Sequence, residues 1–258
     1  MNMMDIGPAQ LAVCSLFVLL AAVGSLVFRL RLEKDLLWGS VRTFAQLFLV
    51  GYVLQFVFRL NNPWMILGLY LWMVFWAAYT IRGRVQEKTI AIFRPTFVAM
   101  VVSYMAVAIF VTAAIVQVKP WYTPQYFIPL GGMIVGNSMN AIAIALERMF
   151  SDLRKQREHI EVAFCLGATY QEATSAVLRD SIKAGMIPSI NALMTVGLVS
   201  LPGMMTGQIL AGADPTTAIR YQILVMLMLV ASTAIGSVIV VLIVRRLCFT
   251  KAHQMVLS

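Results

Sequence analysis

The chain has 258 residues, of which 60% are hydrophobic and only 12% are charged, whereas soluble proteins average about 45–50% and about 25%. This composition excludes a soluble globular protein and predicts an integral membrane protein embedded in a lipid bilayer. The net charge of +9 is explained by membrane orientation, as the loops show below, so nucleic acid binding is not needed to account for it.

Seven apolar runs are candidates for crossing a hydrocarbon core of roughly 30 Å. In chain order they are Ala9–Phe28, Thr43–Phe58, Trp64–Ile81, Phe97–Val118, Tyr126–Leu146, Ala184–Ala211 and Ile219–Val244. Met1–Gly7 contains no basic residue and carries Asp5, so the first run is interpreted as a retained span and not as a cleaved signal peptide. We therefore expect an all-α, polytopic fold of about seven transmembrane helices in a single domain over residues 1–258.

The loops between these runs indicate the orientation, because cytoplasmic loops are enriched in Lys and Arg. With the N-terminus outside, all of the 20 Lys and Arg residues fall on the cytoplasmic side except Arg59, Lys119 and Arg220. The predicted topology therefore has the N-terminus outside and the C-terminus in the cytoplasm.

The fifth run carries small and amide residues on neighbouring helical faces. Gly132 and Gly136 are followed by Asn137 and Asn140, and steps of three or four residues bring side chains together on a helix. Such a surface allows close helix packing and interhelical hydrogen bonds. We expect it to pack against the sixth run or against a second copy of the chain, around a translocation pathway. Simple interhelical hydrogen bonding is the alternative for each amide.

The long cytoplasmic segment at about 147–182 is helical in composition and is interrupted once. Gly167 suits the left-handed position just after a helix end. Thr169 and Glu172 have the spacing of a capping box, which opens a new helix. The pattern predicts a helix, a tight turn and a second helix, which either transmits movement to the membrane or is an ordinary solvated hairpin.

The sixth run contains the stretch SLPGMMTGQILAGADP, where Pro202 and Gly203 weaken a helix interior. We predict that Ser200–Gln208 is a hinge that lines the pathway, with Met204, Met205 and Gln208 nearest the substrate. The two methionines are candidate metal ligands, because thioethers bind soft cations. Alternatively, the proline only bends a packing helix.

Residues for catalysis are missing from the sequence. It has no GxxxxGK[ST], HExxH or GxSxG motif, its two histidines, His159 and His253, lie far apart, and its three cysteines are dispersed. No carboxylate lies in the middle of a predicted span, which argues against a proton-coupled carrier. We therefore expect that the chain is not an enzyme by itself, binds no cofactor, and depends on another polypeptide if ATP drives it.

Several stretches resemble a known family. Glu161-Val162-Ala163 followed by Gly167 is similar to the EAA-type loop of ABC transporter permeases. PLGGMIVGNSMNA from Pro129, LGAT from Leu166 and GLVSLPGMMTGQILAGADPTTAIRYQI from Gly197 resemble the FetB-type family of small permeases.

The resemblance implies a homodimeric permease in the bacterial inner membrane, partnered by a FetA-like ATPase that holds ATP and Mg²⁺. Bacterial members of that family are linked to iron export and plant relatives to aluminium tolerance. The residues implied in contact with the ATPase are Glu161, Ala163, Gly167, Thr169 and Glu172. A self-sufficient ion channel or ion-coupled carrier, with a substrate site at Pro202, and a membrane scaffold without transport stay open as alternatives from the residues alone.

Overall fold

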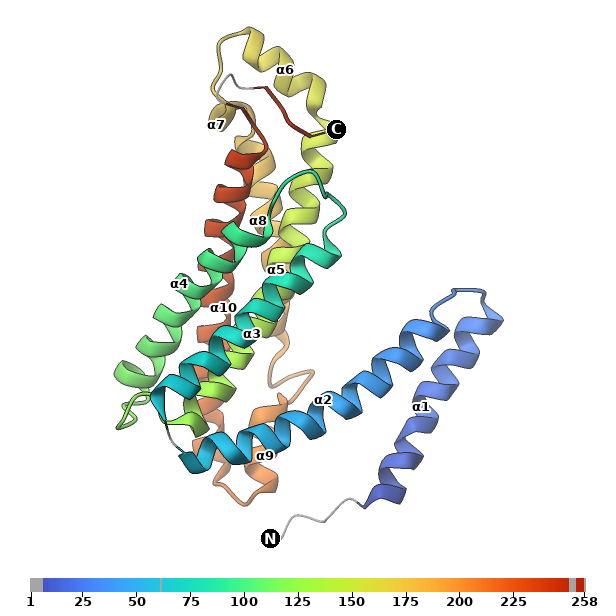
Figure 1. Ribbon diagram of the computed structural model, residues 1–258, viewed down its shortest axis with the longest axis vertical. Helices are drawn as coiled ribbons and strands as arrows, with labels where there is room; N and C mark the ends of the chain where they lie inside the picture. The colour runs from blue at the N-terminus through green and yellow to red at the C-terminus, as the bar shows by residue number, and fades with distance from the viewer. Residues whose placement is uncertain (1–6, 61, 251–253, 258) are drawn as a thin grey trace. The chain divides into compact units, whose positions relative to one another are not determined.

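The computed structural model describes residues 7–60, 62–250 and 254–257 (Figure 1). Asp5 and His253, which enter the sequence interpretation, lie outside these ranges. The described residues form helices, turns and two isolated β-bridges, and no strand occurs among them. The predicted all-α fold is confirmed.

Six described helices are long and apolar enough to cross a membrane. They are α1 Pro8–Val27, α2 Glu33–Leu60, α3 Pro63–Arg84, α4 Phe93–Phe110 with its π-helical extension η1 Val111–Ile115, α5 Pro124–Lys155 and α10 Pro215–Leu247. Their starts differ from the apolar runs because polar end residues join the helices, as Glu33 does in α2.

The expected span Ala184–Ala211 is not one continuous helix. Helix α8 covers Ser175–Thr195, and α9 covers Gly203–Leu210. Between them Val196 is extended and Gly197 has a φ of +83°. Because a left-handed residue cannot continue a right-handed helix, α8 ends before Pro202. The described residues therefore contain six continuous helices that are candidate membrane spans, where the sequence predicts about seven.

The chain divides into two compact units, of which the first contains Met1–Asn61 with Leu210–Gly212. In this unit α1 and α2 form a hairpin. Ser25 stabilises the turn, because its Oγ accepts the Leu32 N–H at 2.9 Å and donates to Glu33 Oε2 at 3.1 Å. Most of the large apolar side chains of this hairpin are exposed. Exposed apolar side chains suit helices that are surrounded by lipid.

The second unit contains Asn62–Ile209 with Ala213–Ser258. Its central helix is α5, which packs against α3, α4, α8 and α10. The approach to α8 is close, since a Cβ on Gly185 would lie 2.6 Å from the Ala141 carbonyl oxygen. Gly132, expected to pack on the sixth run or on a second copy, instead faces α3, where a Cβ would lie 2.9 Å from Met73 Cε. The α5–α8 contact therefore uses a different face of α5.

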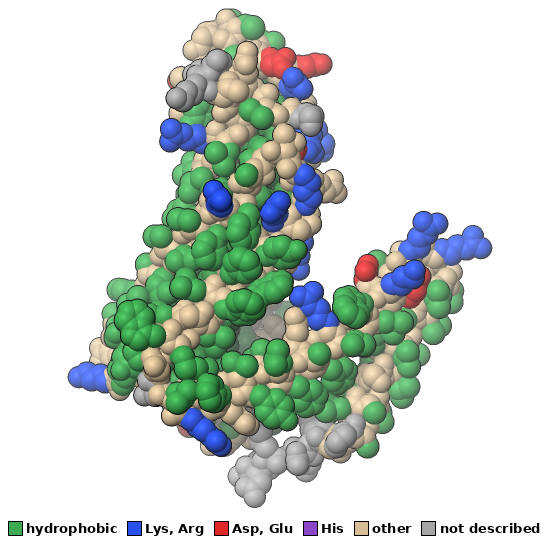
Figure 2. Space-filling view, viewed as in Figure 1, with side chains coloured by type: hydrophobic (Ala, Val, Ile, Leu, Met, Phe, Trp, Pro, Cys, Tyr) green, Lys and Arg blue, Asp and Glu red, His purple; other side chains and the backbone are tan. Residues whose placement is uncertain are grey.

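Basic residues gather at one end of the second unit. Arg84, Lys155 and Arg246 lie in the last turns of α3, α5 and α10, which end on the side where α6 and α7 lie (Figure 1). Figure 2 shows several Lys and Arg side chains over this part of the unit. This grouping is typical of the cytoplasmic side of a membrane protein, and the orientation itself stays a prediction.

Candidate coupling surface and translocation segment

The cytoplasmic segment forms the helix, turn and helix that its sequence predicts. Helix α6 covers Arg157–Cys165 and α7 covers Tyr170–Ala173. Gly167 lies between them with a φ of +87°, the left-handed conformation that glycine adopts without steric cost. The Ala168 N–H donates to the Ala163 carbonyl at 3.0 Å, so the turn is closed by its own backbone.

The predicted capping box is present at the start of α7. Thr169 Oγ1 accepts the Glu172 N–H at 3.3 Å, and Glu172 Oε2 accepts both the N–H and the hydroxyl of Thr169 at 2.8 Å. The bond from the Thr169 N–H, and then that from its hydroxyl, lowers the pKa of Glu172. The Glu172 carboxylate is therefore ionised at neutral pH, the form that accepts both Thr169 donors.

The surface beside the turn is hollowed. A groove of about 780 Å³ is lined by Arg157 and Glu161, by Phe164 and Cys165, by Gly167–Thr169, and by Gln254 and Met255 near the C-terminus. Arg157 Nε donates to Glu161 Oε1 at 2.8 Å. Leu166, at the tip, is 83% exposed. All five implied coupling residues thus lie at this turn or on its helices, and Ala163 also contributes its carbonyl to the turn.

An aromatic cluster of Phe164, Tyr170 and Phe249 connects this turn to the end of α10. Phe249 stacks on Tyr170 with ring centroids 5.6 Å apart and meets Phe164 edge-on at 5.9 Å. The Arg245 guanidinium lies 5.7 Å from the centre of the Tyr170 ring. Sequence reasoning missed this cluster; an aromatic residue on each side of the Gly167 turn was the only local signal.

The residues predicted for the hinge are divided between a loop and a helix. Ser200 and Pro202 lie in the unwound segment Val196–Pro202, whereas Gly203, Met204, Met205 and Gln208 belong to α9. The Gly197 N–H donates to the Ser200 carbonyl at 2.9 Å. The Pro202 carbonyl accepts both the N–H and the hydroxyl of Thr206, each at 3.0 Å. A break exists near the predicted place, but it extends from Val196 to Pro202, and α9 begins directly after Pro202.

The break and α9 contain few side chains that could bind a metal ion. Met204 and Met205 are half-buried on α9. Among the residues that the structure describes, no group of three or more His, Cys, Asp or Glu side chains could hold a metal ion. The Gln208 Oε1 atom is buried and has no hydrogen-bond partner there. Ligation by the methionines stays a prediction.

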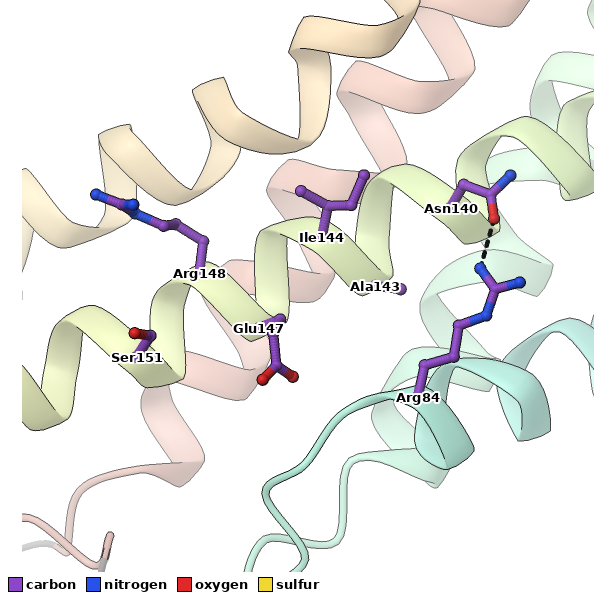
Figure 3. A pocket seen from close by; sticks show the side chains of 7 residues that line it. All are labelled: Arg84, Asn140, Ala143, Ile144, Glu147, Arg148 and Ser151. Carbon is purple, nitrogen blue, oxygen red and sulfur yellow. Dashed lines mark hydrogen bonds between the residues drawn. The ribbon is translucent and has the colours of Figure 1, made fainter. Parts of the chain in front are cut away.

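A second hollow, of about 590 Å³, lies between the basic ends of α3 and α5 (Figure 3). Asn140 Oδ1 accepts a hydrogen bond from Arg84 Nη1 at 2.6 Å, and Glu147 Oε2 accepts the Gln86 N–H at 3.1 Å. Ala143, Ile144, Arg148 and Ser151 complete its lining. Arg84 and Glu147 were not predicted as site residues, because their partners, Asn140 and Gln86, lie far away in the sequence.

Asn137 lies exposed on the same helix, and its Nδ2 donates to the Met133 carbonyl one turn earlier at 3.1 Å. The two predicted amides of α5 therefore have different partners, one within its own helix and one on α3. In the described part of the chain, no hydrogen bond joins either amide to Gln208.

The comparisons with known proteins agree on the family. The family model described as "Uncharacterised protein family (UPF0014)" matches residues 8–249. The chain belongs to the UPF0014 family.

Relatives of this UPF0014 protein occur in bacteria and plants. The "UPF0014 membrane protein slr1647" of Synechocystis is 40% identical over 88% of this chain and 87% of its own length. The "Probable iron export permease protein FetB" of Escherichia coli is 35% identical over 100% and 98%. The "Protein ALUMINUM SENSITIVE 3" of Arabidopsis thaliana is 35% identical over 96% and 90%. No solved structure matches the chain.

These relatives confirm the resemblance to the FetB-type family. With its six long apolar helices, this UPF0014 protein is a multi-pass membrane protein. Its candidate site has three parts, namely the α6–α7 turn with its groove, the break between α8 and α9, and the exposed face of α5. Sequence motifs located the first two parts, and the amides of α5 indicated the third.

Proposed function

We propose that this UPF0014 protein is the permease subunit of an ATP-driven exporter in the bacterial inner membrane. A separate FetA-like subunit binds ATP and Mg²⁺ and hydrolyses the nucleotide, and two copies of the permease form the membrane part. The exported species is iron or another metal ion. The E. coli relative, a probable iron export permease that matches the full length of this chain, supports the transport class and its direction.

The observation that carries the proposal is the turn between α6 and α7, which is closed by hydrogen bonds of its own. It projects exposed residues at the basic end of the second unit, and its capping box fixes the angle between the two helices. Helix α8 begins at Ser175, directly after α7, and Thr174 Oγ1 donates to the Tyr170 carbonyl across that junction at 2.6 Å. Movement at the turn is therefore delivered along α8 to the break at Val196–Pro202.

The break offers the chemistry of a transport path. Backbone groups released from helical bonding are tolerated at membrane depth only where they are buried in protein or line a water-filled cavity. Carbonyls of an unwound segment can coordinate a cation, and Met204 and Met205 next to it add soft sulfur atoms. Oxygen ligands suit hard cations and thioethers suit soft ones, so the metal content of the purified complex, with and without ATP, decides between them.

A self-sufficient channel or ion-coupled carrier is the second candidate, and the same broken helix favours it. The two candidate functions differ in whether the purified permease transports ions without an ATPase. A channel or carrier moves ions in liposomes without an ATPase, whereas the proposed exporter moves them only when the ATPase and ATP are present.

The coupling role is tested by replacing Gly167 with Val. A Cβ at Gly167 meets no neighbour within 4 Å, so the substitution acts through its φ of +87°, which costs a side-chain-bearing residue roughly 1–2 kcal/mol. We expect the variant to insert in the membrane but to lose stimulation of the ATPase and metal transport. Gly83→Val is the control, because Gly83 lies in α3, also has free space, and has no positive φ. Unchanged stimulation and transport in Gly167→Val would remove the turn from the mechanism.

A further inference from the structure

We infer that the described residues after α10, 248–250 and 254–257, form the second wall of the ATPase docking surface, opposite the α6–α7 turn. This inference rests on the proposed function and names a part of the surface that the EAA-type loop does not contain. The docking groove, defined by Arg157, Glu161, Phe164, Met255 and the Gly167 turn, is lined on one side by the turn and its helices and on the other by Gln254 and Met255.

The C-terminal wall is anchored by backbone contacts before and after Met255. Phe249 and Met255 form an antiparallel bridge, and the Val256 N–H donates to the Cys248 carbonyl at 2.9 Å. The Thr250 N–H donates to the Gln254 carbonyl at 2.9 Å. Leu257 is only 3% exposed. Buried side chains before and after Met255 therefore hold it at the groove.

The chemistry of the groove favours a protein as the occupant. Arg157 and Glu161 neutralise each other at 2.8 Å, so the described lining residues of the groove do not present the unpaired positive charge that nucleic acid or anionic headgroups need. Phe164 and Met255 supply aromatic and thioether surface, and residues of both kinds are enriched at protein interfaces. Val162 of α6 and Leu166, the residue directly after that helix, are also exposed. An apolar side chain of the ATPase, surrounded by polar groups, fits this groove.

The aromatic cluster connects the second wall to the residues on both sides of the Gly167 turn. Phe249, at the base of that wall, contacts Phe164 before the turn and Tyr170 after it. Arg245 of α10 lies against Tyr170 and is itself buried. A partner docked in the groove therefore contacts α8 through the turn and α10 through the C-terminal wall, so both helices respond together.

The test compares two neighbouring substitutions in the full-length permease in lipid nanodiscs, with a purified FetA-like ATPase as the probe. Met255 lines the groove, whereas Val256 is 41% exposed and does not line it. Met255→Glu places an unpaired charge in the interface, and we expect the Kd for the ATPase to rise about tenfold or more. Val256→Glu adds the same charge outside the groove and should change the Kd by about twofold or less.

Equal affinities of the Met255→Glu and Val256→Glu variants for the ATPase would overturn the inference about the second wall. The proposed function would still stand in that case if Gly167→Val loses stimulation of the ATPase. A wild-type permease that binds no ATPase would overturn both. If Met255→Glu lowers the melting temperature, Met255→Ala and Val256→Ala repeat the comparison without the charge, and the same order of affinities is required.

Discussion

Glu87 is an acidic side chain that the structure buries outside the membrane helices. It lies between α3 and α4, is 4% exposed, and forms an ion pair with Arg154 of α5. Burial raises its pKa, but hydrogen bonds from the hydroxyl and the N–H of Thr89 and from Arg154 outweigh burial, and the net effect lowers the pKa below its ordinary value of 4.5. The carboxylate therefore ties the α3–α4 loop to the helix that leads to α6.

Glu87→Gln is predicted to lower the free energy of unfolding by roughly 1–3 kcal/mol at neutral pH, because it removes charge-assisted hydrogen bonds from a buried site. Since the folded-state pKa is lowered, the stabilisation by Glu87 is present above pH 4.5 and is lost as the pH falls through the folded-state value. Melting temperatures measured between neutral and acidic pH should therefore converge for the two proteins. Glu161→Gln, at an exposed pair, is the control and should cost about 0.5 kcal/mol or less. A constant difference at all pH values would contradict the prediction.

At the scale of elements, the break between α8 and α9 depends more on Gly197 than on Pro202. Gly197 has a φ of +83° with free space around it, so a side chain there strains the backbone. Pro202 lies before the first residue of α9, where a missing N–H interrupts no helical bond. If Ser200–Gln208 acts as the predicted hinge, the left-handed turn in front of it is the part of the break that a substitution perturbs most.

We expect Gly197→Ala to reduce transport more strongly than Pro202→Ala, because a left-handed alanine costs roughly 1–2 kcal/mol. Single cysteines placed from Ser200 to Gln208 report the path directly through labelling with aqueous thiol reagents, with and without ATP. Labelling that changes with nucleotide supports a hinge along the path. Cysteines that stay unlabelled in every nucleotide state would show that the segment is a packing kink.

At the scale of the whole molecule, α5 leaves one face uncovered although it is the central helix of its unit. Asn137 and Asn140 are exposed there, and a Cβ on Gly136 would meet nothing within 4 Å. Small residues and amides on an open face suit close packing between membrane helices. A second copy of the chain is the partner that the proposed homodimer supplies.

Asn137→Cys is predicted to form a disulfide between two copies in membranes when an oxidant is added. Val98→Cys is the control, because Val98 of α4 is 58% exposed and is expected to face lipid. The readout is a dimer band on a non-reducing gel. A functional complex in which neither Asn137→Cys nor Asn140→Cys crosslinks would place the dimer contact on another face.

The amino-acid sequence determined the features that depend on nearby residues. Apolar runs predicted membrane helices because burial of apolar surface in lipid needs no tertiary partner. Gly167, Thr169 and Glu172 predicted a turn and a capping box because their hydrogen bonds span only a few residues. The family was identifiable because its motifs are contiguous stretches.

The tertiary structure alone decided the features that depend on residues far apart in the chain. The wall at Met255, the aromatic cluster around Phe249 and the hydrogen bond between Arg84 and Asn140 each join segments that the sequence separates. The early end of α8 is a mixed case, since Gly197 was visible in the sequence but its left-handed backbone was not. Local sequence patterns determine the helices and most of their ends. Long-range packing determines which side chains contact each other, because many distant pairings are compatible with the same local pattern.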